Sequence, residues 1–182
     1  MNLRTSMLSL IALAAGAALY AFQDQSPMPT PSAEHKVLER NIGTWDAALD
    51  MGPGAEPAKG AMVIERGPGG FTVVTHFNTD MGGMPFEGRG IDGYDPLKKK
   101  YVSVWVDSMA AAPMMMEGAW DEKAQTMTMF GEMLDMTTGK MAKHKLITKW
   151  TGNDQMDFTI FAPGADGKET ASLKIKYTRK KK

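Results

Sequence analysis

Residues 87–96, EGRGIDGYDP, and residues 101–108, YVSVWVDS, decide the fold class of this chain. In both stretches side chains of two kinds alternate at a period of two, which is typical of β-strands. Between them, Tyr94-Asp95-Pro96 supplies a turn, because an Asp side chain can bond its own turn backbone and Pro interrupts a strand. The two stretches therefore predict a pair of strands joined by a tight turn.

The same two-residue period, interrupted by turns, runs from Gly43 to the end of the chain. It predicts about ten strands, near residues 43–51, 58–66, 70–79, 84–94, 99–108, 113–121, 124–132, 140–150, 155–162 and 170–179. One short helix is expected before them, over residues 32–41. Short connections imply antiparallel neighbours, and closing such a meander removes its two edges. We therefore expect an all-β, up-and-down barrel with one N-terminal helix and room for a small ligand.

The first 32 residues differ from the rest of the chain. Residues 1–21 join a short positive start to an apolar run of about 13 residues, which is typical of a signal peptide and short for a membrane span. An uncleaved anchor is the alternative, because Leu19 stands where a small residue is preferred before a cleavage site. Residues 22–32 predict a Pro-rich linker and residues 33–182 a single barrel domain. We therefore expect an exported protein, periplasmic or extracellular.

The composition narrows the classes of partner. The chain has 182 residues, no Cys and a formal net charge of zero. Loss of residues 1–21 removes one cation, Arg4, and leaves 20 cations against 21 anions, which argues against a nucleic-acid partner. Without Cys the chain has no disulfide and no lipidated cysteine. We expect no membrane span in the mature chain if the leader is cleaved, and the oligomeric state stays open.

The two ends of the predicted barrel carry a matching pair of motifs. Gly43-Thr44-Trp45 opens the first strand and Tyr177-Thr178-Arg179 closes the last. This pair resembles the calycin arrangement of lipocalins and nitrobindin-like barrels, in which a first-strand Trp packs under a last-strand Arg and seals the barrel floor. A guanidinium stacked on an indole contributes about 0.5 to 2 kcal/mol.

A longer series of motifs points to one family. It comprises Glu34-His35-x-x-Leu38, Gly43-x-Trp45, Phe86-Glu-Gly-x-Gly90, Gly93-Tyr94-Asp95, Trp105-x-Asp107-Ser108, Gly118-x-x-Asp121 and Tyr177-x-Arg179. In this order, over residues 33–179, the series resembles a family of bacterial exported proteins known as domain of unknown function 1579. The resemblance implies a calycin-like barrel and transfers no catalytic residue.

Alternation predicts which side chains face the barrel lumen. On the eighth strand, for example, Lys143, Lys145 and Lys149 share one face, which leaves His144 and Trp150 on the other. The inward face of the third and fifth strands stays open by this criterion. The candidates for lining a ligand site are Trp45, Arg89, Trp105, Asp107, Met114, Met116, Met127, Met129, His144, Trp150, Tyr177 and Arg179. A lining rich in flexible Met side chains suits a small apolar or amphipathic ligand, whereas a filled core without a cavity is the alternative.

Methionine and histidine support a second hypothesis, metal or haem binding. The chain has 17 Met, and thioethers together with His bind Cu(I) in exported proteins. However, alternate residues of a strand point to opposite sides, so the consecutive residues 114–116 do not converge on one ion. Nitrobindin-like barrels bind haem through one His on a late strand, and this resemblance makes His144 the candidate, with His76 as a weak metal candidate. We predict no cofactor and keep copper and haem as alternatives.

Charged residues near the opening hairpin form the most interesting polar group. If Glu87, Arg89, Asp92 and Asp107 pair across neighbouring strands, they fix the hairpin, and the alternative is a ligand head-group site at the mouth of the lumen. Residues 88–93 have the glycine spacing of a dinucleotide-binding loop, but no helix follows them, so we interpret the glycines as points of strand bending. The first hypothesis is therefore a non-enzymatic ligand-binding barrel, followed by metal or haem binding and by a structural envelope module with a filled barrel.

Overall fold

The structure describes most of the predicted barrel domain. The computed structural model describes residues 29–135, 139–164 and 168–181, so the predicted leader and most of the predicted linker lie outside the described residues. Pro31–Lys182 form one compact unit. Its elements are α2 (Ala33–Glu39), β1 (Gly43–Leu49), β2 (Ala58–Arg66), the 3-10 turn η1 (Pro68–Gly70), β3 (Thr72–Asp80), β4 (Pro85–Asp95), β5 (Lys100–Asp107), β6 (Met114–Asp121), β7 (Thr126–Asp135), β8 (Lys140–Trp150), β9 (Gln155–Pro163) and β10 (Glu169–Arg179).

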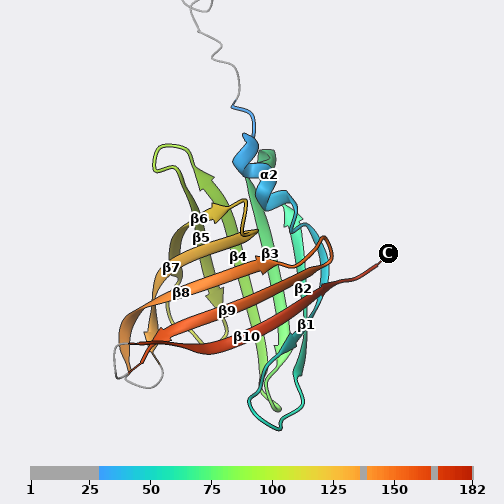
Figure 1. Ribbon diagram of the computed structural model, residues 1–182, viewed down its shortest axis with the longest axis vertical. Coiled ribbons are helices and arrows are strands. Elements are labelled where there is room, and N and C mark those ends of the chain that lie inside the picture. The colour runs from blue at the N-terminus through green and yellow to red at the C-terminus, as the bar shows by residue number, and fades with distance from the viewer. Residues whose placement is uncertain (1–28, 136–138, 165–167, 182) are drawn as a thin grey trace, which may run out of the picture. The chain divides into compact units, whose positions relative to one another are not determined.

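The strands form one closed antiparallel barrel in sequence order (Figure 1). Each strand pairs with its neighbours along the chain, and β1 closes the ring on β10, from Trp45 opposite Arg179 to Leu49 opposite Ile175. This is the up-and-down topology that short connections favour. The predicted fold class is confirmed, and the predicted strand ends differ from the observed ends by at most three residues.

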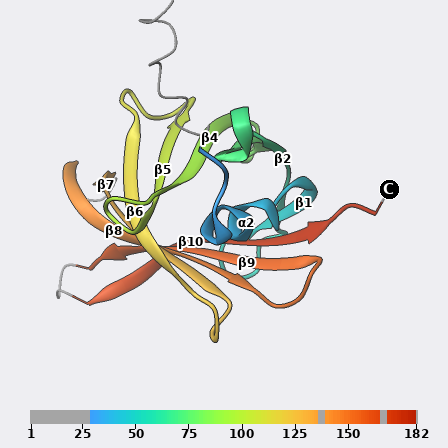
Figure 2. The same ribbon diagram turned by 90° about the horizontal axis from the view of Figure 1, so that it is seen from above.

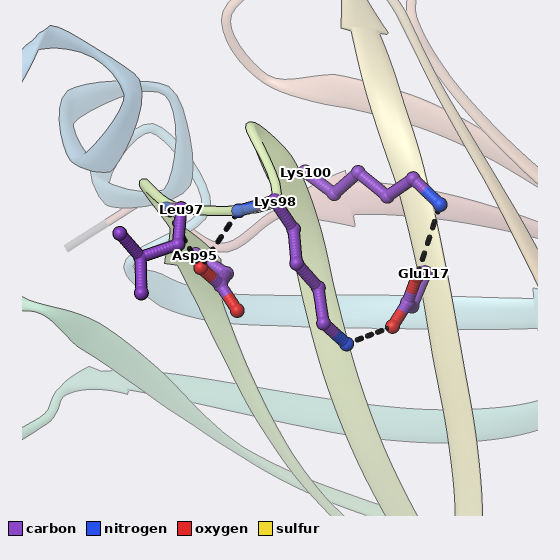
Figure 3. Close-up of polar contacts among 5 residues, drawn as sticks. All are labelled: Asp95, Leu97, Lys98, Lys100 and Glu117. Atoms are coloured by element: carbon purple, nitrogen blue, oxygen red, sulfur yellow. Dashed lines mark hydrogen bonds and ion pairs between the residues drawn. The ribbon is translucent and has the colours of Figure 1, made fainter.

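Two hairpins use the same local device, an aromatic residue followed by an Asp. Asp95 Oδ1 accepts hydrogen bonds from two amides of the β4–β5 turn, at 2.9 and 3.0 Å (Figure 3), and Asp121 Oδ1 accepts one at 2.9 Å in the β6–β7 turn. Each turn then passes through left-handed backbone, at Lys99 with φ 53° and at Gln125 with φ 51°. On the outer face, Glu117 of β6 pairs with two lysines of the first hairpin, which joins β6 to that hairpin (Figure 3).

Helix α2 covers one end of the barrel (Figure 2). It contacts β3 and β4, and its Leu38 is buried in the core. The first turn is capped because the Ser32 amide donates to His35 Nδ1 at 3.0 Å. The Tyr101 hydroxyl of β5 donates to the carbonyl of Glu34 at 3.2 Å, so the helix is also tied to the barrel wall.

Trp45 and Arg179 close the same end of the barrel, as the calycin resemblance implies. The Arg179 guanidinium lies 4.0 Å from the ring centroid of Trp45, which is fully buried. Its Nη1 and Nη2 donate to the carbonyls of Ile42 and Arg40, both at 2.7 Å. Gly43 has a φ of 141°, and a Cβ there would lie 2.7 Å from Arg179 Nη1, so glycine fits both the backbone and the space. We call this stacked and hydrogen-bonded pair the floor contact.

Burial shows which faces of the ambiguous strands point inward. On β3, Val73, Thr75 and Phe77 are buried, so His76 between them faces the outside. On β5, Tyr101 and Ser103 are buried and face inward. Within the described residues, no helix is both long and apolar enough to cross a membrane.

Candidate functional site

The barrel contains a cavity of about 390 Å³. Helix α2 and the floor contact close one end of the barrel, and the lining extends to the opposite strand ends at Met114 and Met133. The lining is mainly apolar, and its methionines are Met62, Met81, Met114, Met116, Met127, Met129, Met133 and Met156. The size and the apolar lining are both in the usual range of small-molecule sites.

Most of the predicted lumen residues lie on the surface of this cavity. They are Trp105, Asp107, Met114, Met116, Met127, Met129, Trp150 and Tyr177. They come from β5, β6, β7, β8 and β10, and on each strand they occupy alternate positions. The period of two is therefore a sound guide to the inner face of this barrel.

Four predicted lumen residues, Trp45, Arg179, His144 and Arg89, are not among the lining residues. Trp45 and Arg179 make the floor contact instead. His144 is buried, and its Nδ1 lies 2.9 Å from the carbonyl of Ala142. Facing inward is thus not sufficient to reach the cavity, because other side chains fill part of the barrel interior.

The predicted polar group of Arg89 with Asp92 and Asp107 does not form. Arg89 lies on the outer face, where its Nη1 donates to the Gly88 carbonyl at 2.8 Å and its guanidinium lies 3.6 Å from the Glu87 carboxylate. Asp92 and Asp107 line the cavity on the inner face. The reason is the pleat: Arg89 and Asp92 are three residues apart on one strand and therefore point to opposite sides.

Trp105 packs against β4 at two glycines. A Cβ on Gly88 would lie 2.1 Å from the Trp105 ring, and a Cβ on Gly90 would lie 3.1 Å from it. These glycines make room for the indole, a role that the interpretation as points of strand bending does not include. The indole Nε1–H donates to Asp107 Oδ2 at 2.9 Å, while Asp107 Oδ1 accepts from two amides of the following turn at 2.8 and 2.9 Å. Both oxygens of Asp107 are therefore occupied by the protein itself.

The histidines do not fit the haem or copper hypotheses. His35 caps α2, His76 faces the outside and His144 lies beside Ala142, so none of the three is among the lining residues. A haem in this lumen would lack the axial His that the nitrobindin resemblance suggests for His144. Likewise, no His is among the described residues that line the cavity with these methionines, so the lining itself offers thioethers without an imidazole for Cu(I). Among the described residues, no three His, Cys, Asp or Glu side chains gather as a metal site.

Asp92 is a charged lining residue that the set of residues predicted from sequence leaves out. It extends from β4 into the cavity, opposite Ser103 of β5. Burial raises the pKa of the Asp92 carboxyl, and a hydrogen bond from Ser103 offsets this only in part. The sequence contains a clue to the position of Asp92, because Gly88, Gly90 and Asp92 share one face of the strand.

The two lining tyrosines are uncharged near neutral pH. Burial, with a smaller effect of the Glu34 charge, raises the pKa of Tyr101 to about 12, and burial also raises the pKa of Tyr177. In the described part of the chain, two lining residues near α2 have buried polar atoms without a hydrogen-bond partner, Asn41 Oδ1 and Trp150 Nε1. Of the two carboxyls in the lining, Asp92 is therefore less completely paired by the protein than Asp107.

Sequence comparison identifies the family. A family model described as a protein of unknown function, DUF1579, matches residues 30–179. This chain belongs to the DUF1579 family. The match covers α2 and all ten strands, which agrees with the motif series of the sequence. No curated protein matches this DUF1579 chain in sequence.

Two solved structures resemble the DUF1579 barrel. Rv2717c from M. tuberculosis has a TM-score of 0.60 and 11% identity, over 83% of this chain and 99% of that chain. The S-type phycobiliprotein lyase CPES from Guillardia theta has a TM-score of 0.50 and 10% identity, over 83% of this chain and 94% of that chain. At these identities the likeness concerns the fold alone.

Proposed function

We propose that this protein binds a small, mainly apolar molecule in the barrel lumen and does not transform it. The observation that carries the proposal is the cavity of about 390 Å³ with its apolar lining. A barrel that served only as a structural module would be expected to fill this space, because protein interiors are normally close-packed. Retaining such a volume costs stability, and a ligand that fills it would offset that cost.

The lining favours an adaptable fit over a single rigid shape. Eight of the lining side chains are methionines, which are unbranched and polarizable and can adjust to the shape of a ligand. Trp105 and Trp150 add large apolar surfaces at the two ends. Binding without conversion is favoured because both lining tyrosines keep their protons near neutral pH and Asp107 is held by its own turn.

Filling the lumen should abolish binding without harming the barrel. Thr148 of β8 lines the cavity between Met127 and Phe158, which are both lining residues. In Thr148→Phe the new ring would occupy the space of a ligand, so the affinity for 1-decanol should fall by at least about tenfold. The measurement is a titration of tryptophan fluorescence in the full chain, because Trp105 and Trp150 border the cavity.

Thr128→Phe is the matched control. Thr128 lies on the neighbouring strand β7, next to the inward-facing Met127, and therefore points away from the cavity. The control should bind 1-decanol as the wild type does. If the wild type shows no saturable response to 1-decanol, or if Thr148→Phe binds it equally well, the lumen is not the binding site.

We also propose that the protein is exported. The support is the sequence of residues 1–21, with its positive start and short apolar run, together with the absence of Cys. The expected mature chain begins after Ala21. Mass analysis of the protein isolated from cell fractions of its native host tests this, and a cytoplasmic protein that retains residues 1–21 would refute it.

A further inference from the structure

The carboxyl group of Asp92 lines a mainly apolar cavity. Asp92 lies on the inner face of β4, between Val73 of β3 and Ser103 of β5 in the barrel register. The hydroxyl residues Thr75 and Ser103 are buried beside it, and both line the cavity with it. A polar patch is thus located on one wall of the lumen, formed by three adjacent strands.

The two lining carboxyls differ in how completely they are paired. Asp107 binds the Trp105 indole with one oxygen and two turn amides with the other. Asp92 faces Ser103 across the register, and that hydroxyl offsets the rise in the pKa of Asp92 only in part. Among the described residues, no Lys, Arg or His lines the cavity. An ionised Asp92 therefore has no cation among the described lining residues to balance its charge, and a buried charge without a partner is costly.

Aromatic rings stand on both sides of this carboxyl. Tyr101 and Trp105 are the inward-facing neighbours of Ser103 along β5, and both line the cavity. The face of an aromatic ring carries negative potential and attracts cations. The combination of one carboxylate with flanking aromatic rings in an apolar cavity therefore matches a ligand with a positive group and an apolar body.

We propose that Asp92 is the head-group site for an apolar ligand that carries one protonated amine. This inference rests on the proposed function and names the class of its ligand. The amine replaces the missing counter-charge, its N–H groups donate to the Asp92 carboxylate, and the apolar body lies among the methionines. An anionic ligand is disfavoured because it would face the Asp92 charge without a basic residue in the lining.

Three probes with the same ten-carbon tail separate these charge classes: decylamine, 1-decanol and decanoate. Each is titrated into the full chain at pH 7.5, below its micelle concentration, with tryptophan fluorescence as the readout. The wild type should bind decylamine at least about tenfold more tightly than 1-decanol, and decanoate most weakly. In Asp92→Asn, which keeps the shape of the side chain and removes its charge, the ratio of the two affinities should fall to within about threefold of one.

The control variant also removes one negative charge, but from the outer surface of the barrel. Glu65 is exposed on β2, and Glu65→Gln should keep the full preference for the amine. The inference is overturned if the wild type binds 1-decanol and decylamine equally well, or binds decanoate best. It is also overturned if Asp92→Asn keeps the wild-type ratio of affinities. In each of these cases lumen binding stands. If none of the three probes binds, lumen binding fails and the inference fails with it.

Discussion

Replacing Arg179 with alanine is expected to lower the free energy of unfolding by about 3 to 5 kcal/mol. The substitution removes three hydrogen bonds and an exposed ion pair of the guanidinium. The two shortest hydrogen bonds, both 2.7 Å, reach the carbonyls of Arg40 and Ile42, and the stacking on Trp45 at 4.0 Å is lost with them. A hydrogen bond to a charged group contributes about 1.5 to 3 kcal/mol. These carbonyls belong to the segment between α2 and β1, so the helix should loosen together with the barrel closure. Urea unfolding followed by circular dichroism measures the loss.

Arg66→Ala is the matched control for this prediction. Arg66 forms an ion pair with Glu39 at 2.8 Å, but its side chain is 55% exposed, so its removal should cost less than about 1 kcal/mol. Arg179→Lys keeps the charge but lacks the planar fork that reaches two carbonyls, and it should be of intermediate stability. Equal stability of the Arg179→Ala and Arg66→Ala variants would mean that the floor contact does not hold the barrel closed.

Local patterns predicted the barrel because in an up-and-down barrel each strand pairs with its neighbour in sequence. The opening hairpin illustrates this: Asp95 was predicted to bond its own turn backbone, and it accepts two turn amides. Local patterns do not show that the first strand pairs with the last. The calycin resemblance predicts a contact between Trp45 and Arg179, and the two residues lie opposite each other on β1 and β10. The turn motifs, the two-residue period and the expected closure of the first strand on the last were therefore sufficient to predict the fold class.

The site was harder to predict because the period of two shows which face of a strand points inward. It does not show whether an inward-facing side chain reaches the cavity. His144 and Trp150 share a face of β8, yet only Trp150 lines the cavity. Cross-strand pairing of Arg89 with Asp107 requires both side chains on one face, whereas the pleat puts them on opposite sides of the sheet. Asp92 is absent from the predicted lining because the sequence alone does not show that the described residues around it in the lumen include no cation.

Replacing Asp92 with asparagine should stabilise the fold near pH 8, by about 1 to 3 kcal/mol, in the absence of any ligand. The amide keeps the size of the side chain and its hydrogen-bonding capacity toward Ser103, but it has no charge to bury. For a domain of this length the change corresponds to a rise in Tm of about 2 to 12 °C. Thermal unfolding of both proteins by circular dichroism measures it. A residue whose removal stabilises the protein is expected at a binding site rather than in a purely structural position.

The gain in stability from Asp92→Asn should increase as the pH rises. Burial raises the pKa of Asp92 above its value of about 3.9 in the unfolded chain, so the folded state holds the proton more tightly. The stability that this proton gives is fully present below about pH 4 and is lost as the pH rises through the folded pKa. Of the other titratable lining groups, Tyr101 and Tyr177 have raised pKa values and stay protonated throughout this range, and Asp107 is present in both proteins. The difference between Asp92→Asn and the wild type should therefore vanish near pH 4, grow with pH and then level off. A difference that is constant from pH 4 to pH 8 would show that Asp92 carries no buried charge, and the head-group site would lose its physical basis.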